Sequence, residues 1–168
     1  MKQLLITAFL GMLCLLTSCS NKKVFDEAEA LKEIYALHNA QRKYHFEKDS
    51  VSFVNQLSED YVEVKNGIVS RPKLEDKLSR YHSYFSQVEF LKWDDLQEPI
   101  IRFSEDGSLA YTVVDKIVKV SYKDENGNQA IGETHFAWTA IYRKTSDGWK
   151  IECAISTNEP ISDNEENE

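Results

Sequence analysis

Four long segments rich in β-branched and aromatic residues follow one another in the second half of the chain, and they constrain the fold more than any other feature. They cover residues 88–103, 109–122, 129–144 and 149–156, and a short polar run that contains glycine separates each from the next. Alternating segments bounded by such runs are typical of strands joined by hairpins. This half of the chain is therefore predicted to form an antiparallel sheet.

The first half of the chain has the spacing of helices. Between residues 26 and 48, apolar, aromatic and histidine residues recur every three or four positions, and charged residues fill the other face. A short helix is expected after the capping candidates Asp49 and Ser50, and a third helix after Ser70, with Pro72 in its first turn.

Between the second and third helices, residues 62–65 alternate as a strand before Asn66-Gly67, a dipeptide typical of tight hairpins. Three helices and an antiparallel sheet predict an α+β domain over residues 25–160.

The register of the hairpins can be predicted, because a shift by one residue moves every side chain to the opposite face. Matching the apolar sides, with a loop of odd length before Gln129, gives these pairs: Trp93–Val118, Asp95–Lys116, Ile101–Ala110, Phe103–Ser108, Val114–Trp138, Val118–Thr134, Ala140–Cys153, Trp138–Ile155, Tyr142–Ile151 and Lys144–Trp149. One face is then expected to pack against the helices: Leu91, Trp93, Ile101, Phe103, Ala110, Val114, Val118, Phe136, Trp138, Tyr142, Ile151, Cys153 and Ile155.

The N-terminus has the pattern of an exported lipoprotein. An apolar run over residues 4–16, preceded by Lys2, is too short for a membrane-spanning helix and ends in Leu-Thr-Ser before Cys19. This pattern resembles a lipobox, which implies a signal peptide over residues 1–18, a diacylglyceryl group on Cys19 and a lipidated tether over residues 19–24. We expect a cell-envelope protein anchored to a bacterial membrane, the outer membrane facing the periplasm if the host has one.

Charge and cysteine content exclude several classes. Cleavage after Ser18 leaves 150 residues, enough for one domain, with a net charge near −9 that disfavours nucleic acid as a partner. Cys14 leaves with the signal and Cys19 carries the lipid, so Cys153 is expected to be a lone, inert thiol. The scattered histidines predict no metal site and no cofactor is expected. Residues 161–168 are predicted to form a disordered acidic tail.

The order of elements resembles the nuclear transport factor 2-like superfamily, in particular SnoaL-like bacterial members. The resemblance covers about residues 27–156 and rests on that order and on two stretches, residues 104–111 and 147–151. It implies a cone-shaped, strongly curved sheet around the first helix, a cavity at the open end, and a homodimer formed through the outer sheet face. Many enzymes of this kind have a histidine on the last strand, which residues 149–156 lack.

Several side chains are candidates for a pocket inside the cone. Aromatic and histidine side chains offer apolar surface with a polar tip, and Asp95 opposite Lys116 is expected to form a neutralised pair that could orient a polar group. The candidate pocket residues are Tyr35, His38, Trp93, Asp95, Lys116, Trp138 and Tyr142. Tyr44 and His45 lie on the same side of the first helix as Tyr35 and His38, and Tyr81, His82, Tyr84 and Phe85 on the third helix could either rim the opening or form an adhesive surface.

A second set of candidate residues is expected on the opposite face of the sheet. Asp115 and His135 are expected near one another there, and Tyr111, Val113, Ala137 and Ile141 could form an apolar patch that another chain covers. The leading interpretation is a lipid-anchored domain that binds a small apolar or aromatic molecule or acts as a dimeric interaction module. The alternatives are an isomerase, cyclase or dehydratase that uses Asp95 or a first-helix histidine as base, and a scaffold protein.

Overall fold

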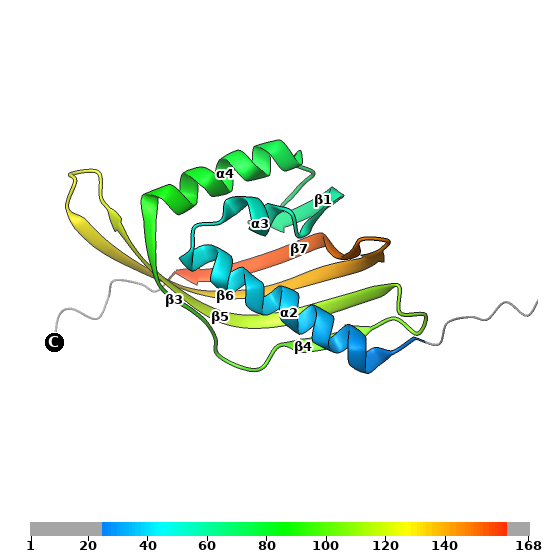
Figure 1. Ribbon diagram of the computed structural model, residues 1–168. Coiled ribbons are helices and arrows are strands. Elements are labelled where there is room, and N and C mark those ends of the chain that lie inside the picture. Colours follow the sequence, from blue (N-terminus) through cyan, green and yellow to red (C-terminus); the bar gives the residue numbers. More distant parts are fainter. Residues whose placement is uncertain (1–24, 161–168) are drawn as a thin grey trace, which may run out of the picture.

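Three helices lie on one face of a strongly curved sheet in the computed structural model, which describes residues 25–160 (Figure 1). The elements are α2 (Glu27–Phe46), α3 (Ser50–Val54), β1 (Leu57–Lys65), β2 (Ile68–Ser70), α4 (Leu74–Gln87), β3 (Val88–Asp95), β4 (Ile100–Phe103), β5 (Leu109–Lys123), β6 (Gln129–Thr145) and β7 (Gly148–Pro160). The predicted α+β class is confirmed. The predicted signal peptide, Cys19, the tether and the acidic tail lie outside the described residues.

Side-chain caps define the start of two of the helices. The carboxylates of Asp26 and Asp49 accept hydrogen bonds from the third residue after each and cap α2 and α3. The predicted cap of the third helix is wrong: Ser70 pairs with Glu63 as the last residue of β2, and α4 begins three residues later than expected, after Lys73. No helix within residues 25–160 is both long and apolar enough to cross a membrane.

The strand order is β2-β1-β7-β6-β5-β3, with β4 also paired to β5. The β1–β2 hairpin turns at Asn66 and Gly67, whose φ angles of 52° and 75° fit the tight turn predicted for this dipeptide. The β1–β7 pair is parallel, whereas the other pairs are antiparallel. This long-range pair sets residues 57–65 beside the last strand.

The central register is confirmed. Val114 pairs with Trp138 and Asp95 pairs with Lys116. The β5–β6 loop has five residues, 124–128, which is the odd length that the apolar pattern requires. Val114, Val118 and Tyr142 are consequently buried. Tyr142 joins a core cluster that includes Ile34 of α2, and Val118 joins a second cluster that includes Phe85 of α4.

The last strand departs from the predicted register. Tyr142 pairs with Ile151 as expected, but Ile141 pairs with Cys153, so Glu152 is an extra residue in β7. Such a bulge reverses the facing of every later residue in the strand and bends it. The predicted pairs Ala140–Cys153 and Trp138–Ile155 are therefore wrong, and Ala154 and Ser156 stand opposite Ala140 and Trp138 instead.

A second bulge and a break alter the strand predicted over residues 88–103. Leu91 is skipped between the pairs Phe90–Val120 and Lys92–Lys119, and it is 50% exposed, so its predicted inward position is wrong. Residues 96–99 leave the ladder and divide the segment into β3 and β4. Ile101 pairs with Thr112 and Phe103 pairs with Ala110, in each case two residues away from the predicted partner. Because this register shift is an even number of residues, both side chains still point to the predicted face.

Candidate functional site

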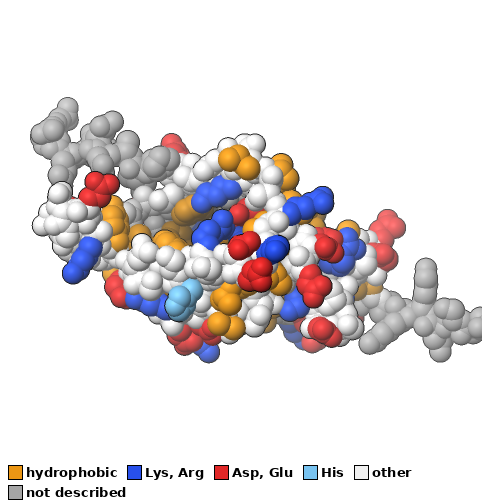
Figure 2. All heavy atoms as spheres, turned by 90° about the horizontal axis from the view of Figure 1, so that it is seen from above, with side chains coloured by type: hydrophobic (Ala, Val, Ile, Leu, Met, Phe, Trp, Pro, Cys, Tyr) orange, Lys and Arg blue, Asp and Glu red, His pale blue; other side chains and the backbone are white. Residues whose placement is uncertain are grey.

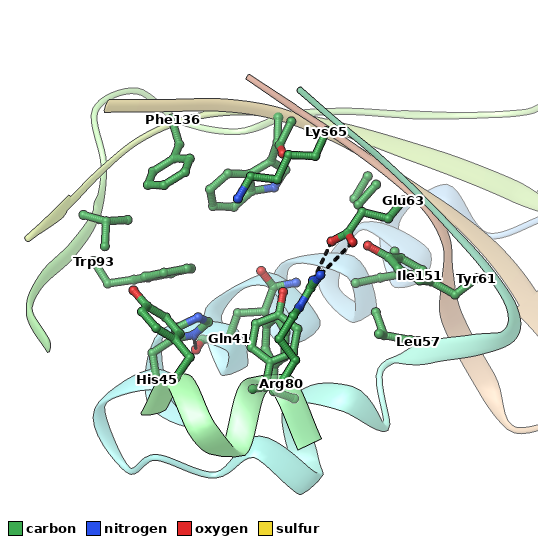
Figure 3. Close-up of a pocket in the computed structure, with 18 residues that line it drawn as sticks. Gln41, His45, Leu57, Tyr61, Glu63, Lys65, Arg80, Trp93, Phe136 and Ile151 are labelled. Atoms are coloured by element: carbon green, nitrogen blue, oxygen red, sulfur yellow. Dashed lines mark hydrogen bonds and ion pairs between the residues drawn. The ribbon is translucent and has the colours of Figure 1, made fainter. Parts of the chain in front are cut away.

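A cavity of about 510 Å³ lies between the helices and the sheet, with α4 on one side and β6 on the other (Figure 3). Strands β1, β3, β5, β6 and β7 all contribute to its walls, and α2, α3 and α4 close the opposite side. Small-molecule sites in proteins commonly enclose about 300 to 1,000 Å³. The cavity is therefore large enough to hold a small organic molecule.

Aromatic rings form much of the lining. Trp93 of β3 and Trp138 of β6 lie 6.0 Å apart between ring centroids, and Phe136 lies two residues before Trp138 on the same face. Phe53 of α3 and Tyr81 of α4, 4.5 Å apart, line the helical side. A molecule in this cavity would contact apolar and aromatic surface on both sides.

His45 of α2 lines the cavity as a neutral imidazole. Its Nδ1 donates a hydrogen bond to the carbonyl oxygen of Gln41 at 2.6 Å, which leaves Nε2 as an acceptor. The ring stacks on Trp93 with 3.5 Å between centroids. Burial lowers the pKa of His45 to about 3, so this imidazole can accept a hydrogen bond but is a weak base at neutral pH.

Charged side chains form one edge of the cavity. Glu63 of β1 accepts hydrogen bonds from Lys77 Nζ at 2.9 Å and from both terminal nitrogens of Arg80 at 2.8 and 3.1 Å. Burial would raise the pKa of Glu63, but the hydrogen bonds from Arg80 and Lys77 outweigh burial and lower the pKa to about 2. Lys77 is only 1% exposed, and burial lowers its pKa.

The predicted pair Asp95–Lys116 exists and includes a third member. Asp95 accepts hydrogen bonds from Lys116 Nζ at 2.5 Å and from His38 Nε2 at 2.8 Å. Burial would raise the pKa of Asp95, but the bonds from His38 and Lys116 outweigh it and lower the pKa. Lys116 Nζ lies 5.5 and 5.7 Å from the ring centroids of Trp93 and Trp138, so this cluster adjoins the cavity without lining it.

The other candidate pocket residues have separate places. Of the seven, Trp93 and Trp138 line the cavity, and Tyr35, His38, Asp95, Lys116 and Tyr142 do not. Tyr35 donates to Glu98 at 2.7 Å, and Tyr142 is 1% exposed within the core. Tyr81 and Tyr84, two of the possible rim residues on the third helix, line the cavity.

The expected proximity of Asp115 and His135 is confirmed on the opposite face of the sheet. His135 Nε2 is hydrogen-bonded to Asp115 Oδ1, and Gln97 donates to the other carboxylate oxygen at 3.1 Å. Both members of the pair are partly exposed to solvent. Within residues 25–160, no three His, Cys, Asp or Glu side chains gather in a way that could hold a metal ion.

The three charged lining residues, Glu63, Lys65 and Arg80, were not among the sequence candidates. The first two alternate with valines in β1, and only the parallel pairing with β7 brings them to the cavity. One indication was available in the sequence. Lys77 occupies the apolar stripe of α4 that also contains Leu74 and Tyr81, and a lysine in such a position requires a buried partner.

Comparison with known proteins supports the fold through structure alone. No protein-family model matches the chain, and no curated protein matches it. A conserved protein from Planctomyces limnophilus matches with a TM-score of 0.67 and 20% identity, over 81% of this chain and 100% of that one.

Two further structures with the same fold are similar to this chain. A nuclear transport factor 2-like protein from Cytophaga hutchinsonii matches with a TM-score of 0.60 and 15% identity, over 80% of this chain and 100% of that one. A ketosteroid isomerase-like protein from Erwinia carotovora atroseptica matches with a TM-score of 0.58 and 16% identity, over 82% and 100%. The chain therefore has the nuclear transport factor 2-like fold that its sequence resembles.

Proposed function

We propose that the cavity between α4 and the sheet binds a small apolar or aromatic molecule. The observation that carries this proposal is the cavity of about 510 Å³ with Trp93, Phe136 and Trp138 on one side and Phe53 and Tyr81 on the other. Bound molecules gain most of their affinity from apolar surface removed from water, and a few polar groups fix their orientation. The His45 Nε2 acceptor and the charged edge supply such groups.

The properties of Asp95 and His45 favour binding over proton transfer by these two groups. A general base in an isomerase, cyclase or dehydratase works best when its pKa lies near the working pH. Asp95 has a lowered pKa and is held by two cationic or hydrogen-bonding partners, and His45 has a pKa of about 3. Neither group accepts a proton readily at neutral pH.

Filling the cavity is expected to abolish binding. Ala154 of β7 lines the cavity, so Ala154→Phe should weaken binding of the neutral fluorescent probe N-phenyl-1-naphthylamine by at least about tenfold, because the new ring takes the space of the ligand. Fluorescence titration of the purified protein measures this. The matched control is Ala36→Phe on an exposed position of α2, which should bind the probe like the original protein. Equal probe binding by both variants would contradict the proposal.

We propose further that Cys19 carries a lipid that holds the domain on the cell envelope, facing the periplasm from the outer membrane if the host has one. The support is the sequence pattern before Cys19. Mass spectrometry of the protein from bacterial membranes should find an N-terminal Cys19 with a diacylglyceryl group, and Cys19→Ala should move the protein to the soluble fraction. An intact residue 1–18 segment on the membrane-bound protein would contradict this proposal.

The outer sheet face is proposed to pair two copies of the chain. Ile100, Val113, Thr139 and Ile155 are successive register partners across β4, β5, β6 and β7, and the three apolar members are 39 to 50% exposed. A row of this kind suits a self-complementary interface. Val113→Lys should convert a dimer into a monomer in analytical ultracentrifugation, whereas Ile68→Lys in β2 should not. A protein that is monomeric before substitution would contradict this proposal.

A further inference from the structure

The edge of the cavity carries more positive than negative charge. Among the lining residues that the structure describes, the cations are Lys65 and Arg80, and the sole carboxylate is Glu63, which also neutralises Lys77. Three cations therefore lie near one carboxylate, which pairs with two of them. The whole chain has the opposite balance, with 28 acidic against 20 basic residues. The positive charge is thus a local feature of this site rather than a property of the surface at large.

Lys65 is the cation that Glu63 leaves without a partner. No ion pair or hydrogen bond joins its ammonium to another residue within the described part of the chain. Lys65 lies two residues after Glu63 on β1 and has the same facing, and in Figure 3 its side chain extends over the cavity. An unpaired ammonium beside aromatic surface attracts an anionic group of a ligand.

Two further donors lie beside Lys65. Ser156 is the register partner of Lys65 in the parallel β1–β7 pair, and both residues line the cavity. Arg80 is 54% exposed and uses two of its N–H groups on Glu63, so other N–H groups of its guanidinium face outward from that pair. Figure 2 shows Lys and Arg side chains beside hydrophobic side chains on the face seen from above.

We propose that the natural ligand is an amphiphilic anion, a carboxylic acid with an aromatic or alkyl body. The body occupies the space between Trp93, Phe136 and Tyr81, and the carboxylate lies at the edge, where it accepts hydrogen bonds from the ammonium of Lys65 and the hydroxyl of Ser156. This assignment rests on the proposed binding function and adds the chemical class of the ligand. It also accounts for the excess of cations over Glu63, because the bound carboxylate supplies the missing negative charge.

Two ligands with the same ring system test the charge requirement. At neutral pH, 2-naphthoate is an anion and methyl 2-naphthoate is neutral, and displacement of N-phenyl-1-naphthylamine from the purified protein measures the Kd of each. The anion is expected to bind at least about tenfold more tightly than the ester at low ionic strength. The ratio should fall as salt is raised to about 500 mM, because the Lys65 edge is open to solvent and is screened.

Lys65→Met should reduce this ratio to within about threefold of one. Lys32→Met, at an exposed position of α2 where the lysine pairs with Glu29, should leave the ratio as it is. Equal affinities for anion and ester in the original protein, or a ratio that survives Lys65→Met, would overturn the assignment and leave the binding function standing. Failure of the probe and of both ligands to bind would overturn the binding function as well.

Discussion

Replacing Glu63 by glutamine is expected to lower the free energy of unfolding at neutral pH by about 3 kcal/mol. The glutamine keeps the shape of the side chain but removes the negative charge that compensates Lys77, whose side chain is 1% exposed. An ammonium without a counter-ion in such a position must be either dehydrated or deprotonated, and both destabilise the fold. Urea denaturation followed by tryptophan fluorescence measures the loss.

Two comparisons separate the charge effect from a general disturbance. Glu75→Gln removes an exposed carboxylate that pairs with Lys73 at 3.6 Å, and should cost less than about 1 kcal/mol. The double variant Glu63→Gln with Lys77→Met should recover most of the loss, because it removes the buried cation together with its partner. A Glu63→Gln protein as stable as the original would show that Lys77 does not depend on this carboxylate.

The same ion pair predicts the acid sensitivity of the protein. The pKa of Glu63 is about 2 in the folded state against an ordinary value of 4.5, so ionised Glu63 stabilises the fold. This contribution is complete above pH 4.5 and is lost as the pH falls from 4.5 toward 2, at about 1.4 kcal/mol per pH unit and about 3 kcal/mol in all. Glu63→Gln should accordingly have a shallower pH dependence of stability than the original protein in this interval.

Replacing Asp95 by asparagine is the second large change. It should lower the free energy of unfolding by about 3 kcal/mol, because Lys116 and His38, whose side chains are each 3% exposed, would lose the charge that they share. The neighbouring residue offers a matched control. Asp94 pairs with Arg42 at 3.3 Å, and both side chains are about half exposed, so Asp94→Asn should cost less than about 1 kcal/mol.

This prediction also bears on function. Asp95 does not line the cavity, and its lowered pKa suits a structural ion pair rather than a base. Chemical denaturation gives the stability of both variants, and probe titration gives their affinity. A stable Asp95→Asn protein would mean that the cluster is not needed to hold β3 against α2 and β5, and the carboxylate would then be free for another role.

Much of the fold can be predicted from local patterns in the sequence. Four predictions depend on residues that lie close together in the chain, and each is confirmed. They are the helical spacing of apolar residues in α2, the cap at Asp49, the turn at Asn66-Gly67, and the facing of side chains in β5 relative to β6. The two bulges could not be predicted in the same way. Ile151, Cys153 and Ile155 alternate without interruption, so the extra residue Glu152 leaves no trace in the apolar pattern.

The site was only partly predictable for a related reason. The alternation of side chains along the strands placed Trp93 and Trp138 on the helix-facing side of the sheet, and both line the cavity. The charged edge depends on contacts between segments that are far apart in the sequence, namely β1 with β7 and β1 with α4. The alternation in residues 62–65 places the valines and the charged residues on opposite faces of the strand. It does not indicate that the charged face lies against Lys77 and Arg80.

A crystal structure of the protein with N-phenyl-1-naphthylamine would show directly whether the cavity under α4 binds a small molecule. We expect the probe to lie between Trp93, Phe136 and Trp138 on the sheet side and Tyr81 on the helical side, within the cavity of about 510 Å³. Density for the probe on the outer sheet face near Val113, with side chains filling the cavity under α4, would contradict this expectation.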